Sequence, residues 1–144
     1  ARARDAGVRR IICVGTTLED ARRVIEIAET YDMVEATVGI HPCDADTVKD
    51  ESFVEELRTL AQHPKVVGIG EIGLDYHHQP PEGFDLEQWK AHQAFVLKCQ
   101  LELAAELNVS VAAVNKRIRK GTIQAYLGMN GQWVIPINKE RRNP

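Results

Sequence analysis

Three short apolar runs, each rich in β-branched residues and each ending in glycine, constrain the fold of this chain more than any other feature. They cover residues 10–15, 34–39 and 65–70. Runs of this kind are typical of strands that are buried on both faces of a parallel sheet. The segments between them have helical apolar spacing. The order βαβαβα therefore predicts an α/β fold with parallel strands and right-handed crossovers.

The helical segments carry start signals and apolar faces. Helices are predicted over residues 18–31, with Thr17 as N-cap, over residues 52–62, and after residues 80–83, with Asp85 as cap. The residues expected on their apolar faces are Val24, Ile27, Ala28, Tyr31, Phe53, Leu57, Leu60, Trp89, Phe95, Leu101 and Leu107.

Polar residues follow the second and third predicted strands. Glu71 comes at the end of the third strand, Asp75 and Tyr76 follow in a glycine-opened loop, and His41 follows the second strand. The carboxyl ends of parallel strands are where α/β folds place their chemistry. Two carboxylates at one such mouth suit a hard divalent cation or acid–base chemistry. The structural alternative is that Glu71 caps a helix or pairs with an arginine.

Three motifs carry a resemblance to a known family. They are V-G-T-T-L-E-D at residues 14–20, T-V-G-I-H-P at 37–42 and V-V-G-I-G-E-I-G-L-D-Y at 66–76, with a similar helix at 100–108. Residues 3–108 thus resemble the TatD family of metal-dependent deoxyribonucleases. The resemblance implies a TIM-barrel-like (β/α)8 fold, of which residues 1–108 form three βα units.

The same resemblance implies two divalent metals that activate water against a phosphodiester. Glu71 maps onto a family metal ligand, and His41, Asp75 and Tyr76 map onto pocket positions.

The metal site that the resemblance implies is incomplete in this sequence. The family's H-x-H pair and its P-[V/I]-x-x-H-x-R histidine are missing, and residues 109–116 read V-S-V-A-A-V-N-K instead. No catalytic residue is assigned. Whether the chain acts as an enzyme stays open, and we expect no phosphodiester cleavage by the chain alone. The other histidines, which are expected to be exposed or to pack, are His63, His77, His78 and His92.

The charge changes sign along the chain. Residues 1–107 carry a net charge of −9 and residues 108–144 a net charge of +6, within a total of −3. The basic region is the candidate for contact with nucleic acid, and the alternative is a solvated basic segment. Residues 139–144 form a basic tail.

Residues 100–138 have the apolar spacing of a helix-turn-helix. Ala104 is small at the helix crossing, Asn108 suits the turn, and Gly121 ends the second helix. Met129-Asn130-Gly131 predicts a hairpin between residues 122–126 and 132–137. The whole resembles the excisionase- and MerR-like winged helix-turn-helix domains. The residues predicted to cap or face DNA are Ser110, Asn115, Lys116, Arg117, Arg119 and Lys120.

Two alternatives to the DNA-binding hypothesis stay open. Residues 109–137 would in one case continue the α/β domain as a further helix and hairpin. In the other, the overlap of both resemblances at residues 100–108 marks the junction of a recombined or engineered chimaera without a specific biochemical function.

The remaining expectations concern location and assembly. Cys13, Cys43 and Cys99 lie far apart with no C-x-x-C motif, which indicates reduced thiols in a cytoplasmic protein. The chain starts without a signal-like apolar segment, and no apolar run reaches the roughly 18 residues of a membrane helix, so no membrane partner is expected. Exposed strand edges predict a homo-oligomer.

Overall fold

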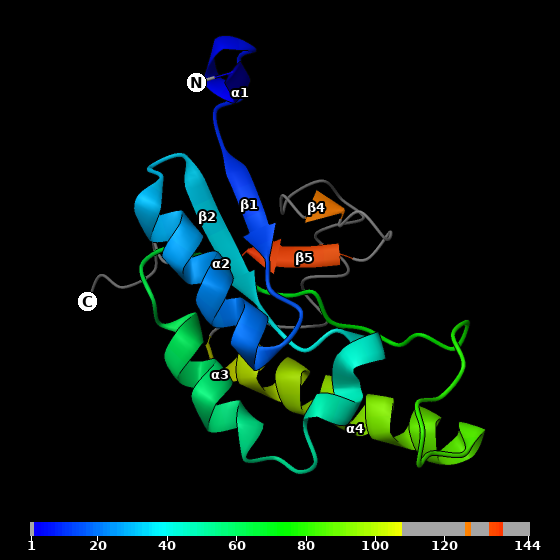
Figure 1. Cartoon of the computed structure of the whole chain (residues 1–144). Coiled ribbons are helices and arrows are strands. Elements are labelled where there is room, and N and C mark those ends of the chain that lie inside the picture. The colour runs from blue at the N-terminus through cyan, green and yellow to red at the C-terminus, as the bar shows by residue number, and fades with distance from the viewer. Residues whose placement is uncertain (1, 108–125, 128–132, 137–144) are drawn as a thin grey trace, which may run out of the picture.

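The computed structural model of the chain describes residues 2–107, 126–127 and 133–136. In this part, helices and strands alternate as the sequence predicts (Figure 1). The elements are α1 (Arg2–Asp5), β1 (Ile11–Val14), α2 (Leu18–Thr30), β2 (Val34–Val38), η1 (Pro42–Thr47), α3 (Phe53–Ala61), β3 (Val66–Ile69), α4 (Leu86–Glu106), β4 (Tyr126–Leu127) and β5 (Trp133–Pro136).

The sheet has a parallel half and an antiparallel half. Its strand order is β1-β2-β3-β5-β4. The β1–β2 and β2–β3 pairs are parallel, which confirms the predicted α/β class with three parallel strands. The β4–β5 pair is antiparallel, with Tyr126 opposite Val134, and the predicted turn at residues 129–131 lies outside the described residues.

β5 also pairs with the parallel half of the sheet. β5 pairs antiparallel with β3, with Gly68 opposite Pro136. Residues 108–121 of the predicted helix-turn-helix lie outside the described residues. This range includes all the residues predicted to cap or face DNA, from Ser110 to Lys120. The basic tail at residues 139–144 also lies outside the described residues.

The caps of the helices form as predicted. The Thr17 side chain accepts a hydrogen bond of 3.1 Å from the Asp20 N–H at the start of α2. At the start of α4, Asp85 accepts from the Gln88 N–H at 2.8 Å, and the Gln88 side chain accepts from the Asp85 N–H at 3.1 Å. This reciprocal capping box satisfies two N–H groups that the first turn leaves without helical partners.

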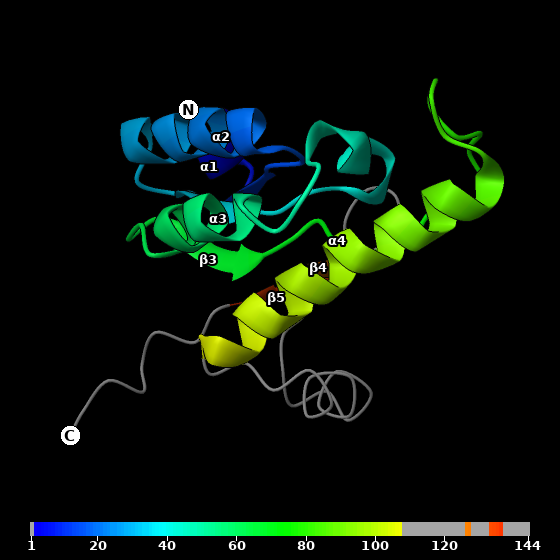
Figure 2. The same cartoon turned by 90° about the horizontal axis from the view of Figure 1, so that it is seen from below.

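The helices cover the sheet in two groups. α2 and α3 lie side by side on one face of the sheet, and α4 runs diagonally past η1 (Figure 2). The face of α4 that packs on the core contains both apolar and polar side chains at helical spacing. Its buried residues include Trp89, Gln93, Val96, Gln100 and Leu103. No helix in the described part of the chain is both long enough and apolar enough to span a membrane.

Some of the predicted apolar positions are not in the core. Ile27 and Tyr31 are 45% and 58% exposed, because Ile25 takes the buried position on α2 and Tyr31 follows the end of that helix. Phe95 is 36% exposed, since the buried face of α4 passes through Gln93 and Val96 on either side of it. The expectations for Val24, Ala28, Phe53, Leu57 and Trp89 are confirmed.

Glycines at two strand ends allow close backbone contacts near the candidate site. A Cβ atom on Gly15 would lie 2.8 Å from the Cα atom of Ala21. A Cβ atom on Gly39 would lie 3.0 Å from the carbonyl carbon of Gly70 and 3.2 Å from the backbone carbonyl oxygen of Glu71. The chain after β2 therefore packs directly on the backbone that carries Glu71.

Candidate metal-binding site

Two buried glutamines of α4 fix the loops that carry the candidate site. The Gln100 side chain accepts from the Ile40 N–H at 2.7 Å and donates to the Ile40 carbonyl at 3.1 Å. The Gln93 side chain makes the same pair of bonds with Asp75, at 2.7 and 2.9 Å. The two glutamines are seven residues apart, so they share one helix face. One helix thereby positions the segment before His41 and the loop after β3.

Glu71 lies where the sequence predicts, directly after β3. Its side chain is buried, at 6% exposure. Burial raises the pKa of the Glu71 carboxyl above its ordinary value, and the charge of the nearby His41 partly opposes this shift. The peptide bond between Gly70 and Glu71 is cis. The structure thus brings the predicted residues Glu71 and His41 within electrostatic range of each other.

His41 connects the ends of two strands. Its backbone N–H donates to the Thr16 carbonyl at 2.8 Å, which links the segment after β2 to the segment after β1. Its Nδ1 atom accepts from the Cys43 N–H at 3.1 Å at the start of η1. The imidazole Nδ1 is therefore hydrogen-bonded to the local backbone.

Asp75 is held as an ionised carboxylate. Its Oδ1 atom accepts from the backbone N–H groups of His77 and His78 at 2.9 and 3.1 Å. Its Oδ2 atom lies 2.8 Å from His78 Nδ1 and accepts from the Cys43 thiol at 3.4 Å. Partial burial alone would raise the pKa of Asp75. The hydrogen bonds from His78, His77 and Cys43 outweigh it and hold the pKa well below its ordinary value.

Cys43 and His78 join Asp75 in a group that the sequence analysis did not identify. Their ligand atoms, Sγ, Nδ1 and Oδ2, all lie within 4.8 Å of one another. Burial, the hydrogen bond to Asp75 and the nearby carboxylates raise the pKa of Cys43 to about 11. The spacing D-x-x-H was visible in the sequence. The partner from η1 was not, because it depends on how the two loops meet.

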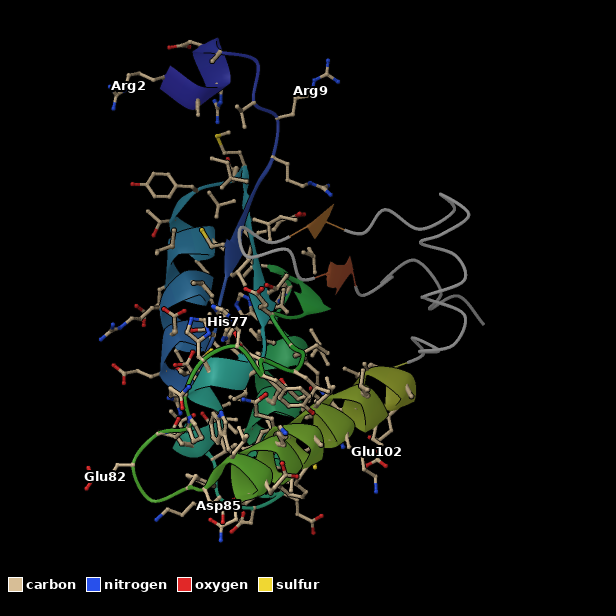
Figure 3. All side chains as sticks on the ribbon, turned by 90° about the vertical axis from the view of Figure 1, so that its right-hand side faces the viewer. Arg2, Arg9, His77, Glu82, Asp85 and Glu102 are labelled. Carbon is tan, nitrogen blue, oxygen red and sulfur yellow. The ribbon has the colours of Figure 1, made fainter. Side chains whose placement is uncertain are left out.

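Several other candidates stand apart from this group. Tyr76 is about half exposed, and the Lys90 ammonium lies 5.8 Å from the centre of its ring. His92 Nε2 lies 2.9 Å from the carbonyl oxygens of Ala45 and Val48, so it serves packing as expected. His63 pairs with Glu29 at 3.1 Å. His77 lies on the loop that precedes Asp85, the N-cap residue of α4 (Figure 3).

Comparisons with known proteins agree on one family. The sequence model described as TatD related DNase matches residues 1–115. The chain is 40% identical over 111 residues to the 3'-5' ssDNA/RNA exonuclease TatD of Cronobacter sakazakii, across 77% of this chain and 39% of that protein. It is 36% identical over 117 residues to the uncharacterized metal-dependent hydrolase YjjV of Escherichia coli, across 81% and 42% of the two chains.

The fold comparison gives the same answer. The crystal structure of YjjV, a TatD homologue from Escherichia coli, superposes with a TM-score of 0.60 at 34% identity. The match covers 75% of this chain and 39% of that one. The chain therefore spans about two fifths of the length of the relatives that it matches.

Proposed function

This chain belongs to the TatD related DNase family, and from that premise we propose that it supplies part of a divalent-metal site that hydrolyses phosphodiester bonds in single-stranded nucleic acid. The observation that carries the proposal is the buried Glu71 carboxylate at the end of β3, beside His41. The substrate class comes from the relatives named 3'-5' ssDNA/RNA exonuclease.

The residues at the strand ends fit a divalent metal. Burial disfavours the charged form of Glu71, and a cation at this carboxylate would favour that form again. A carboxylate oxygen and an imidazole nitrogen are both common ligands of catalytic metals. When bound, such a metal polarises a phosphoryl oxygen and lowers the pKa of its water. Glu71 would hold the ion.

We propose further that these 144 residues do not cleave phosphodiesters by themselves. The sequence has five histidines, no H-x-H pair and no P-[V/I]-x-x-H-x-R segment. Glu71 is then the one family ligand that it supplies, and a single carboxylate does not hold two metals. Incubation of the chain with end-labelled single-stranded DNA and Mn2+ should leave the DNA intact. Cleavage that disappears in Glu71→Ala would show that the site is complete.

A graft tests the role of Glu71 directly. Residues 3–108 of this chain replace the matching segment of Cronobacter sakazakii TatD, to which the chain is 40% identical. We expect the graft to retain metal-dependent cleavage of single-stranded DNA, and Glu71→Gln to abolish it. Glu82→Gln, at an exposed position in the loop before α4, is the matched control. Equal rates for the graft and its Glu71→Gln variant would refute the proposal.

DNA binding by the basic segment is a second candidate function. Its support is the net charge of +6 over residues 108–144 and the antiparallel β4–β5 pair. Weak duplex binding should strengthen at low salt and be lost in Arg117→Ala with Arg119→Ala. Arg141→Ala with Arg142→Ala is the control for charge alone. Equal binding by both double variants would refute specific DNA contact by Arg117 and Arg119 and would favour the alternative of a solvated basic segment.

The proposal of a chimaera concerns the same region. The family match continues to residue 115, so it includes the helix that carries the proposed junction at residues 100–108 and extends beyond it. A recombined chain without a specific function predicts neither metal-dependent cleavage nor salt-dependent DNA binding by the 144-residue chain.

Self-association is proposed through the edge strand β1. β1 is at one end of the strand order, and Ile11 on it is 36% exposed. Unpaired strand edges favour pairing between copies. Light scattering should give a dimer for the chain and a monomer for Ile11→Lys, and a monomer in both cases would refute the proposal. The cytoplasmic location stays a prediction.

A further inference from the structure

Three side chains with different ligand atoms converge between η1 and the loop after β3. They are Cys43, Asp75 and His78, and Glu71, the family's metal ligand, is not one of them. We propose that these three residues form a separate Zn2+ site that ties η1 to this loop. The site would leave the fourth tetrahedral position to water.

The distances in the group fit a tetrahedral zinc ion. Cys43 Sγ lies 3.4 Å from Asp75 Oδ2 and 3.7 Å from His78 Nδ1, and the nitrogen and oxygen are 2.8 Å apart. Tetrahedral bonds of ordinary zinc lengths place sulfur about 3.5 Å from each of the other ligands, and nitrogen about 3.3 Å from oxygen. The Asp75–His78 pair would therefore open by about half an ångström, and the other two distances already match.

The carboxylate is oriented so that one oxygen is available to a metal. Asp75 Oδ1 accepts the two backbone N–H groups of His77 and His78, and Oδ2 faces the other two ligand atoms. The backbone of Asp75 is held in turn by the buried Gln93 through two hydrogen bonds. Such supporting bonds fix ligand orientation in metal sites. The geometry thus exists before a metal binds.

The ligand set selects a borderline-soft ion. Thiolate and imidazole favour Zn2+, whereas Mg2+ and Mn2+ prefer oxygen ligands. Binding replaces protons, because the hydrogen that Cys43 donates to Asp75 leaves as the thiolate forms. His78 would present an unprotonated Nδ1, with its proton on Nε2. With one thiolate, one carboxylate and a neutral imidazole, the two negative charges balance the ion.

Cobalt is the probe for the sulfur ligand. The full 144-residue chain is freed of metal with a chelator and titrated with Co2+ alone, since a cysteine thiolate gives bound Co2+ a charge-transfer absorption that oxygen and nitrogen ligands do not. We expect one equivalent to produce this absorption. Cys43→Ser and Cys43→Ala should abolish it, whereas Cys13→Ala should keep it. Absence of the absorption, or its survival in Cys43→Ser, would overturn the proposal.

Zinc affinity, measured by competition with a chromophoric chelator, tests the histidine. We expect His78→Ala to weaken Zn2+ binding by at least about tenfold. His77→Ala is the matched control, because His77 is the exposed neighbour of His78 and its ring is not in the group. The Zn2+ affinity of the His77→Ala variant should equal that of the unchanged chain. Equal affinities for His77→Ala and His78→Ala would overturn the site.

A third measurement separates this site from the one at Glu71. Zn2+ should protect Cys43 of the unchanged chain from alkylation by iodoacetamide, as read by mass spectrometry, and Glu71→Gln should keep that protection. Loss of zinc binding in Glu71→Gln with retention in Cys43→Ser would place the ion at Glu71 and refute the proposal. Failure of the nuclease graft would leave the zinc result unaffected, so the two proposals fail independently.

Discussion

Replacement of Gln100 by leucine tests whether α4 holds the end of β2. Gln100 and Ile40 are both 1% exposed, and the glutamine amide satisfies both backbone groups of Ile40. Leucine has nearly the same size but no hydrogen-bonding atoms. The change would leave a buried N–H and a buried carbonyl without the partner that they have in the native fold.

The cost follows from these two groups. A buried polar group that loses its partner costs about 1–3 kcal/mol, so two of them cost about 2–6 kcal/mol. The added apolar surface of leucine returns about 1–2 kcal/mol. The free energy of unfolding should therefore fall by a central value of about 2.5 kcal/mol, within a range of about 0–5 kcal/mol.

Urea denaturation followed by circular dichroism measures this change. With an m-value of about 2 kcal/mol/M, the central value corresponds to a fall of the midpoint by about 1 M. Glu102→Leu, an exposed change two residues along α4, should change the unfolding free energy by less than about 0.5 kcal/mol. If Gln100→Leu and Glu102→Leu shift the midpoint equally, the two hydrogen bonds do not hold the β2 end and the reasoning is refuted.

Three further predictions concern the same loops. Gln93→Leu should destabilise the fold by only about 1–2 kcal/mol in the same urea assay, because its bonds to Asp75 are partly exposed to water, but it should weaken zinc binding in the chelator competition; unchanged affinity would contradict the orientation argument. Gly39→Ala should lower stability by about 1–3 kcal/mol, because its Cβ would lie 3.0 Å from the Gly70 carbon, and a midpoint equal to that of the unchanged chain would contradict the close packing. The pKa of Asp75 is lower in the folded chain than in the unfolded chain, so the ionised carboxylate stabilises the fold above the unfolded pKa of about 4, and this stabilisation is lost as the pH falls below that value. Asp75→Asn should therefore reduce the dependence of the unfolding free energy on pH between about pH 5 and pH 2. An unchanged pH dependence would contradict the depressed pKa.

Local signals in the sequence were enough for the parallel half of the fold. The β-branched runs ending in glycine became β1, β2 and β3, and Thr17 and Asp85 cap the helices that they were predicted to cap. The face of α4 was harder to predict. Gln93 and Gln100 are polar but occupy core positions, because each satisfies backbone groups of a distant loop. The apolar Phe95 on the same helix is 36% exposed.

The candidate site shows the same division. Residues that follow neighbouring parallel strands meet at one edge of the sheet, so the sequence predicts that Glu71 and His41 lie near each other. In the structure, the two side chains are within electrostatic range. The convergence of Cys43 with Asp75 and His78 depends on two loops that are 32 residues apart in the chain and meet only in the folded protein. The pairing of β5 with β3 is likewise a long-range contact, and the Asn-Gly turn predicts only the local hairpin.

The rate of Mn2+-dependent cleavage of single-stranded DNA by the TatD graft, with and without Glu71→Gln, tests the central claim most directly. Loss of a metal ligand removes several kcal/mol of transition-state stabilisation, so the rate should fall by about 100-fold or more, and Glu82→Gln should leave it unchanged. A folded graft that cleaves DNA equally well with glutamine at position 71 would contradict the assignment of Glu71 to a catalytic metal.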